Sequence, residues 1–312
     1  MTKRMLVVFL ALGSLAHSNS VSAASPPQLQ WQDNNCWMLS IVYLLWSMPE
    51  LTDWIVTQTF TPGTPLAAYA NLVKAIVKKA DGGNHYAKEL AALKGALERM
   101  LGRGFGGMSV PSDFFTRFHT ILPDAKEAKD KLLDLFGTCP ISKPKKVTLF
   151  EVQVVSLPQD GKLCLENLAY ANNPVVAVPY LVFWFEPVLE KNIMEGKLVP
   201  LTIDVASAVK GDFEVCEYEL VNIVVNHRNS HYTTYLKDGG VWYHSHNLRD
   251  TVPTVDDFVS KNKAGFWNLG NWPSLLLYKR TKLVVKKDPL QEALGRLSGS
   301  LTKLAEGLKP TL

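Results

Sequence analysis

Closely spaced cysteines are missing from this sequence. Its 312 residues include only four, Cys36, Cys139, Cys164 and Cys216, with no C-x-x-C pair and no companion histidine at zinc-ligand spacing. A structural zinc site is therefore not expected, and we predict neither a metal nor a cofactor. If Cys36 stays a thiol, at most one disulfide can form among the other three cysteines.

A large excess of charge of either sign is also missing. Lysine and arginine number 33 and aspartate and glutamate 29, which gives a formal net charge of +4. Lys3 and Arg4, at the N-terminus, supply two of the positive charges. So small a surplus does not predict binding to nucleic acid.

The apolar run at the N-terminus is too short for a membrane-spanning helix. It covers the 12 residues from Met5 to Ala16, whereas a helix needs roughly 20 to cross a bilayer. Basic residues precede the run, and small residues at Val21 and Ala23 follow it, as a signal peptidase requires. We predict a cleaved signal peptide over residues 1–24 and an exported protein with no stable membrane anchor. A short N-terminal core helix is the alternative.

The two halves of the remaining chain differ in pattern. Residues 65–136 have Ala, Leu, Lys and Glu at helical spacing, interrupted by glycine-rich turns. From Lys146 onward, segments rich in β-branched and aromatic residues alternate with turn signals, which is typical of antiparallel strands. Helices followed by strands indicate an α+β fold of two lobes with a cleft between them. The strand-like segments are residues 147–155, 174–185, 198–205, 213–225 and 231–235.

The C-terminal residues 283–312 form a separate unit. Six leucines there follow a 4-3-4-3-4 spacing, the seam of a short amphipathic helix. Two interpretations stay open: a helix that packs on its own domain, and a helix that pairs with a partner or in a coiled-coil dimer. The main domain then covers residues 25–282. The six leucines are Leu290, Leu294, Leu297, Leu301, Leu304 and Leu308.

Cys36 lies where a polar loop enters an apolar segment. The polar residues 32–35 precede it, and the apolar residues 37–46 predict a buried helix that ends before Pro49. A thiol at the start of a helix lies near unpaired backbone N–H groups and the positive end of the helix dipole, which favour the thiolate. Cys36 is therefore a candidate nucleophile. An inert buried cysteine is the alternative.

His231 lies 195 residues after Cys36, at the start of an apparent β-hairpin. A turn signal at residues 238–240 joins its strand to a second one with polar side chains at residues 244–247. A side chain on that second strand can orient the ring of His231, as a general base requires. A cysteine and a histidine in this order fit a nucleophile and its base. A histidine with only a structural role is the alternative.

Both segments resemble motifs of the ubiquitin-specific proteases, which are papain-like cysteine peptidases. "NNCWMLSIVYLL" is similar to the family's Cys box, G-N-T-C-Y-x-N-S-x-x-Q-x-L, and "SHYTTYLKDGGVWYHSHN" to its His box, G-H-Y-x-x-Y followed by W-Y-x-F-D/N-D. Three weaker similarities occur in the family's order. Residues 124–127 and 132–134 resemble Q-Q-D-A-x-E-F with L-L-D, "VVAVPYLVFWFEP" resembles L-x-V-x-L-K-R-F, and "PSLLLYKR" resembles A-Y-x-L-F-Y. The resemblance implies a papain-like two-lobed fold over most of the chain after the leader.

The resemblance fails at the family's oxyanion-hole position. The family has an asparagine five residues before the nucleophile, where this sequence has Trp31. Gln30, six residues before Cys36, has the spacing of the glutamine in papain-like enzymes, and Gln32 is the second choice. Either amide can donate to a tetrahedral oxyanion. The family's paired C-x-x-C zinc ligands are absent too, so any fingers subdomain is short or free of metal.

The third catalytic position also departs from the family. Counted from the His-box tryptophan, the family's Asp or Asn falls on His246, and the acidic residue after it falls on Asn247. The Asn247 amide oxygen accepts a hydrogen bond from imidazole at every relevant pH, whereas a second imidazole does not. We therefore prefer Asn247, with His246 as the alternative.

The resemblance implies a deubiquitinase that cuts after the C-terminal glycine of ubiquitin or a related modifier. With the predicted leader, such an enzyme would be an effector that a bacterium exports into a eukaryotic host cell. Two alternatives remain. One is a general exported papain-like peptidase or transferase, and the other is an inactive pseudo-protease that keeps only ubiquitin binding.

Overall fold

The computed structural model describes a helical region, a large sheet and a C-terminal helix. The described residues are 26–32, 34–79, 85–101, 152–153, 177–184, 198–206, 212–228, 231–246, 253–264, 266–267, 270–286 and 289–307. Several predictions lie outside them: the leader at residues 1–24, Cys139, Cys164, the family-like residues 124–134, and Asn247.

Among the described residues, four helices precede the strands in the chain and a fifth lies between the last two strands. They are α1 (Cys36–Trp46), α2 (Pro49–Thr57), α3 (Pro65–Val77), α4 (Ala87–Leu101) and α8 (Phe258–Lys263). Local sequence explains where they begin. Thr64 caps α3, since its hydroxyl accepts a hydrogen bond from the backbone N–H of Ala67 at 3.2 Å, and Pro65 occupies the first helical position.

In the described part of the chain, eight strands form one sheet. Along the sheet the order is β1-β2-β8-β4-β5-β6-β7, with β3 paired to β4 off this path, and every pair is antiparallel except β1 with β2. Helices first and mostly antiparallel strands afterwards confirm the α+β class. The strands are β1 (Val152–Gln153), β2 (Tyr180–Trp184), β3 (Thr202–Asp204), β4 (Phe213–His227), β5 (His231–Asp238), β6 (Val241–Ser245), β7 (Thr254–Val255) and β8 (Trp272–Val285).

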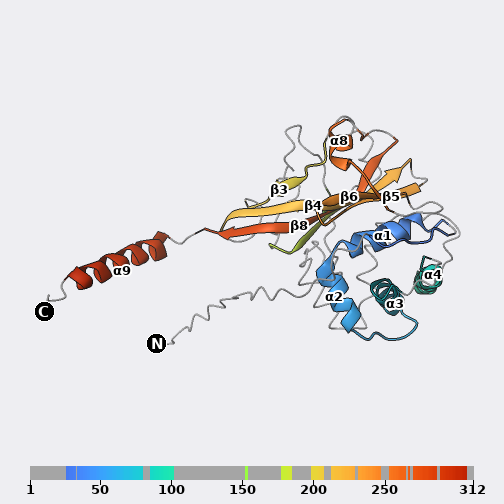
Figure 1. Ribbon diagram of the computed structural model, residues 1–312, viewed down its shortest axis with the longest axis horizontal. Helices are drawn as coiled ribbons and strands as arrows, with labels where there is room; N and C mark the ends of the chain where they lie inside the picture. The colour runs from blue at the N-terminus through green and yellow to red at the C-terminus, as the bar shows by residue number, and fades with distance from the viewer. Residues whose placement is uncertain are drawn as a thin grey trace.

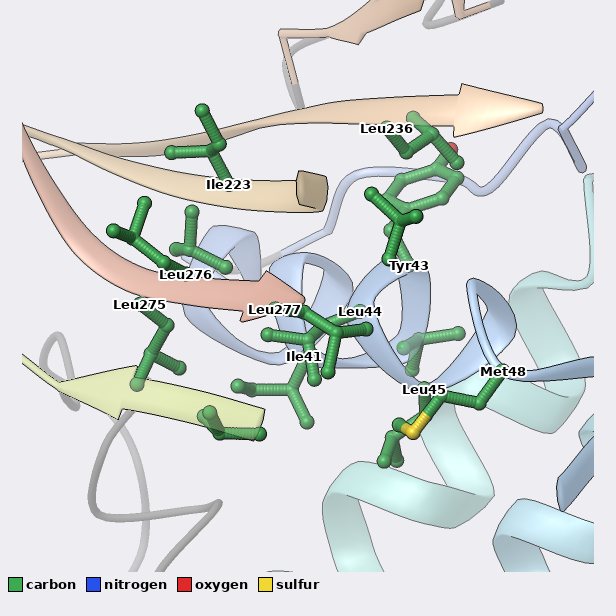
Figure 2. Close-up of a cluster of buried hydrophobic side chains, with 14 of the residues drawn as sticks. Ile41, Tyr43, Leu44, Leu45, Met48, Ile223, Leu236, Leu275, Leu276 and Leu277 are labelled. Atoms are coloured by element: carbon green, nitrogen blue, oxygen red, sulfur yellow. The ribbon is translucent and has the colours of Figure 1, made fainter. Parts of the chain in front are cut away.

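Helix α1 is the centre of the hydrophobic core. Its sequence, CWMLSIVYLLW, is apolar on all sides, and ten of its eleven residues are buried, as expected for a helix with no polar face. Figure 2 shows Ile41 and Leu44 close to Leu277 of the sheet. The Asn222 amide of β4 donates to the Tyr43 carbonyl at 3.2 Å, which ties the end of α1 to the sheet.

Helix α2 is joined to strands β2 and β8 of the sheet by polar contacts. Tyr180 of β2 donates its hydroxyl proton to Glu50, and Lys279 of β8 pairs with the same carboxylate at 3.0 Å. Helices α3 and α4 pack on each other, and α3 also packs on α2. The result is a helical layer beside the sheet, with α1 between them (Figure 1).

The C-terminal helix α9 (Pro289–Gly307) lies beyond the end of β8, away from the other helices (Figure 1). Leu294, Leu297 and Leu301 of its leucine seam are 56%, 60% and 67% exposed. The interpretation of this helix as packed on its own domain is therefore wrong for these three leucines. Among the described residues, no helix has the length and apolar character needed to span a membrane.

Candidate active site

Cys36 is the first residue of α1, and the loop before it is folded around Asn35. The Asn35 side-chain oxygen accepts the backbone N–H of Gln32 at 3.0 Å, and its amide donates to the Gln30 carbonyl at 3.4 Å. The Asn35 carbonyl accepts the first helical N–H groups, from Met38 and Leu39, at 2.9 Å each. Asn35 thus holds Gln30 and Gln32 of this loop and starts the helix. Sequence reasoning missed this residue, although an asparagine before a helix is a common turn-forming signal.

The thiol of Cys36 is buried, with only 3% of the residue exposed. Burial raises the pKa of the Cys36 thiol, and backbone N–H groups of Tyr232, Trp37 and Cys36 itself lower this pKa by a smaller amount. The sequence predicts a stabilised thiolate at the helix start, and this prediction was wrong for the resting molecule. The start of the helix supplies backbone N–H donors to the sulfur as expected, but the loss of water around the sulfur has the larger effect on the pKa of the thiol.

His231 is held through one ring nitrogen. Its Nε2 lies 2.6 Å from the backbone carbonyl oxygen of His246. A carbonyl only accepts, so Nε2 carries the proton and, in the neutral ring, Nδ1 carries the lone pair. Burial lowers the pKa of His231, which the His246 carbonyl partly offsets, so the neutral ring is favoured at neutral pH.

The fold brings Cys36 and His231 together from distant parts of the chain. Helix α1 packs against β5, and the backbone N–H of Tyr232, the residue after His231, reaches the Cys36 thiol. The structure therefore places the candidate nucleophile beside the start of the strand that carries the candidate base. It leaves Nδ1 of His231 as the nitrogen with the lone pair.

The β5–β6 hairpin, which leads to the candidates for the third catalytic residue, forms as the sequence predicts. Gly239 and Gly240 have φ of 54° and 86°, the conformation that a two-residue hairpin turn requires. The register of β5 with β6 then runs from Asp238↔Val241 to Thr234↔Ser245. His246 follows directly, and its backbone carbonyl, not its side chain, contacts His231. The sequence framed this position as a choice between two side chains, Asn247 and His246, and did not consider a backbone atom.

The two glutamines proposed for the oxyanion hole lie in the loop before Cys36. The Gln30 amide donates to the carbonyl of Trp31 at 3.2 Å, and the backbone N–H of Gln30 donates to His85 at 3.0 Å. Gln32 holds the loop through its backbone, since its carbonyl accepts the N–H of Asn35 at 3.0 Å. One N–H of the Gln30 amide is thus engaged, and its second N–H is the one that can donate to a reacting carbonyl.

A second histidine beside His231 was missed by the sequence reasoning. His227 of β4 is the register partner of His231, and the two rings stack with centroids 6.0 Å apart. Nδ1 of His227 bonds to Asn271 at 2.6 Å, and Nε2 bonds to Thr233 at 2.8 Å. Burial lowers the pKa of His227. Its position four residues before His231 in the sequence was the available signal.

The site contains several histidines but no arrangement typical of a metal centre. Within the part of the chain that the structure describes, no group of three His, Cys, Asp or Glu side chains is placed to hold a metal ion. The chemistry that the described arrangement offers is that of a thiol next to the start of the strand that carries an oriented neutral imidazole.

The fold is similar to that of solved deubiquitinase modules. Similar solved structures include the SAGA Ubp8/Sgf11/Sus1/Sgf73 DUB module bound to ubiquitin aldehyde, with 14% identity, 85% of this chain and 71% of that chain covered, and a TM-score of 0.59. The same module bound to monoubiquitin matches with 14% identity, coverage of 82% and 69%, and a TM-score of 0.56.

A third similar structure is the pseudoubiquitin hydrolase-RNA exonuclease module of Saccharomyces cerevisiae Pan2. It has 16% identity and a TM-score of 0.54 over 89% of this chain and 57% of that chain. No family model matches the sequence, and no curated protein matches it either. Identities of 14–16% show a shared fold and no more.

Proposed function

We propose that this protein is a cysteine protease that hydrolyses peptide or isopeptide bonds after the C-terminal glycine of ubiquitin or a ubiquitin-like modifier. One observation carries the proposal. Cys36 starts a buried helix and receives a backbone N–H from Tyr232, next to His231, whose ring the His246 carbonyl holds. The shared fold with ubiquitin-bound deubiquitinase modules supports the choice of substrate.

The proposed reaction begins with a neutral pair. Because burial raises the pKa of Cys36 and lowers that of His231, the resting site holds a thiol and a neutral imidazole. Nδ1 of His231 takes the thiol proton as the sulfur attacks the substrate carbonyl. The tetrahedral intermediate collapses, the amine leaves with the proton from His231, and a thioester to Cys36 remains. Water, deprotonated by His231, then releases the carboxylate and restores the thiol.

Three groups assist this reaction in our proposal. The backbone N–H groups at the start of α1 and the amide of Gln30 donate to the oxyanion, with Gln32 as the second choice. The backbone carbonyl of His246 orients His231 and accepts a hydrogen bond from its Nε2–H in both charge states. The Asn247 side chain is the second candidate for the orienting role. If it held that role, Asn247→Ala would lower kcat strongly, whereas with the carbonyl in that role the substitution costs little.

The place of action is part of the proposal. The predicted leader at residues 1–24 supports export, and a ubiquitin substrate requires a eukaryotic cell, so we propose an effector that acts inside a host. Intact-mass measurement of the exported protein should find a chain that begins at Ala24 or Ser25. An exported chain that starts at Met1 would contradict the cleaved leader.

An inactive ubiquitin-binding pseudo-protease is the second candidate function. Burial of Cys36, which raises the pKa of its thiol, favours it, because access to the sulfur then requires a rearrangement. Trp31, at the family's oxyanion position, favours it as well. A general exported papain-like peptidase is a third candidate that uses the same cysteine and histidine on another substrate.

A ubiquitin with a cysteine-reactive C-terminus tests the proposal. The mature protein should gain the mass of one ubiquitin at Cys36, and Cys36→Ala should abolish the adduct. Cys216→Ala is the matched control, because Cys216 is also a buried free thiol with a pKa raised by burial, yet it lies in β4. Folded protein that forms no adduct would contradict the ubiquitin-directed proposal. Peptidase activity without the adduct would favour the general peptidase.

A further inference from the structure

Three rings form a column on one face of the β5–β6 hairpin. Tyr235 and His244 are register partners on adjacent strands, and their rings stack at 4.1 Å with an interplanar angle of 4°. His244 and His246 are two residues apart and so point to the same face, where their rings lie 4.0 Å apart. The buried ring of His244 therefore lies between Tyr235 and His246.

The lower end of this column is anchored in the core. Tyr235 packs on Phe258 of α8 at 5.1 Å and on Phe266 at 5.9 Å, and both Tyr235 and Phe258 are 1% exposed or less. The His244 ring thus rests on a rigid surface, which in turn supports the exposed ring of His246.

His246, at the other end of the column, carries the backbone carbonyl oxygen that orients the His231 ring. His246 lies one residue past β6, beyond the last β5–β6 register pair at Thr234↔Ser245. The described contacts of His246 are the ring contact with His244 and the carbonyl contact with His231 at 2.6 Å. His246 lies past the last register pair, so among its described contacts the ring contact with His244 is the one that holds this residue against the hairpin.

We propose that His244 is a positioning residue, which holds His246 so that its backbone carbonyl keeps the proton of His231 on Nε2 and the lone pair on Nδ1. This inference rests on the proposed function for its catalytic consequence, but the state of the His231 ring exists whether or not the protein is an enzyme. His244 acts through its flat shape and contact area, so an aromatic ring of similar size should replace it.

The test compares His244→Ala with His244→Phe in the full chain. Nitrogen-15 NMR of the His231 ring, assigned by its loss in His231→Gln, reports which nitrogen carries the proton. Wild type and His244→Phe should show the proton on Nε2, and His244→Ala should show a mixture of the two tautomers. On a fluorogenic ubiquitin substrate, His244→Ala should lower kcat by up to about 100-fold with little change in KM, and His244→Phe should restore most of it.

A double-mutant cycle separates positioning from general stability. His246→Ala removes the same ring contact from the exposed side and keeps the backbone carbonyl, so it should reproduce the effect of His244→Ala. The double variant should add nothing further. Additive effects on kcat, or an unchanged His231 tautomer in folded His244→Ala, would overturn the proposal. If His244→Ala does not fold, His246→Ala supplies the same two measurements.

The outcomes also distinguish this inference from the proposed function. A mixed tautomer in His244→Ala, with no ubiquitin turnover in the wild type, would support the positioning role and contradict the enzyme. Turnover in the wild type with the same tautomer in all variants would contradict the positioning role and leave the enzyme supported.

Discussion

Strands β4 and β8 run side by side over their whole length, yet their two ends lie in different surroundings. At the inner end, Leu276 and Leu277 of β8 and Ile223 of β4 have no exposed surface, and Leu277 lies on the face toward α1 (Figure 2). At the outer end, Leu283 is 39% exposed and Val285 is 60% exposed, and α9 follows them into solvent (Figure 1). One pair of strands thus contributes both a core and an open surface.

The difference between these ends depends on α1. A strand of apolar residues is buried only where another element covers it. Helix α1 covers the inner end of the strand pair but not the outer end. The same helix carries Cys36 at its first residue. The covered end is therefore also the end where a thiol, an imidazole and several backbone donors meet in a place with little water.

The largest expected difference between the two ends is catalytic. His231→Ala at the inner end should lower kcat on a fluorogenic ubiquitin substrate by about 10⁴-fold or more, because thiol activation is lost. Lys282→Ala, an exposed position at the outer end, is the matched control and should keep the wild-type rate. Retention of a tenth of the rate by His231→Ala would refute its role as the base.

Stability should differ along a single strand. Leu277→Ala removes a side chain with no exposed surface and should lower the free energy of unfolding by about 2–5 kcal/mol. Leu283→Ala, six residues later on the same strand, should change it by no more than about 0.5 kcal/mol. Urea denaturation of the two variants measures both values. Equal losses would mean that the outer end is covered in solution.

Acid should weaken the region around the ring column. Burial lowers the pKa of His244 from an ordinary 6.5 to about 3, so the folded state keeps this ring neutral where the unfolded chain takes up a proton. The unfolded state thus binds more protons below pH 6.5, and stability is full above that pH and declines as pH falls toward 3. His244→Phe should reduce the fall in urea midpoint between pH 6.5 and pH 4. An identical fall in urea midpoint in both proteins would exclude His244 as a source of the acid sensitivity.

Removal of α9 should have the smallest effect. A chain that ends at Lys286 keeps β8 whole, including the Phe213↔Val285 pair, and loses only the helix and its exposed leucines. Because these leucines do not contact the core, kcat/KM on a small fluorogenic substrate should change less than about twofold. Loss of turnover in a folded truncated chain would show that α9 supports the site.

Much of the candidate site follows from the sequence, but its charge states do not. The step from polar residues to an apolar run predicted a helix that starts near Cys36, and the glycine pair predicted the hairpin after His231. Both features depend on neighbours in the chain. Burial of the thiol depends instead on how α1 and β5 pack, and the wrong expectation of a stabilised thiolate came from consideration of the helix alone.

The sequence by itself determined the α+β order of elements, the buried character of α1 and the β5–β6 hairpin, because each depends on local periodicity or turn chemistry. Only the tertiary structure decided that Tyr232 contacts Cys36, that His227 stacks on His231 and that the His246 carbonyl orients the base. These contacts join residues on different elements. A backbone carbonyl is present at every residue, so no residue type in the sequence can indicate which one points into a site.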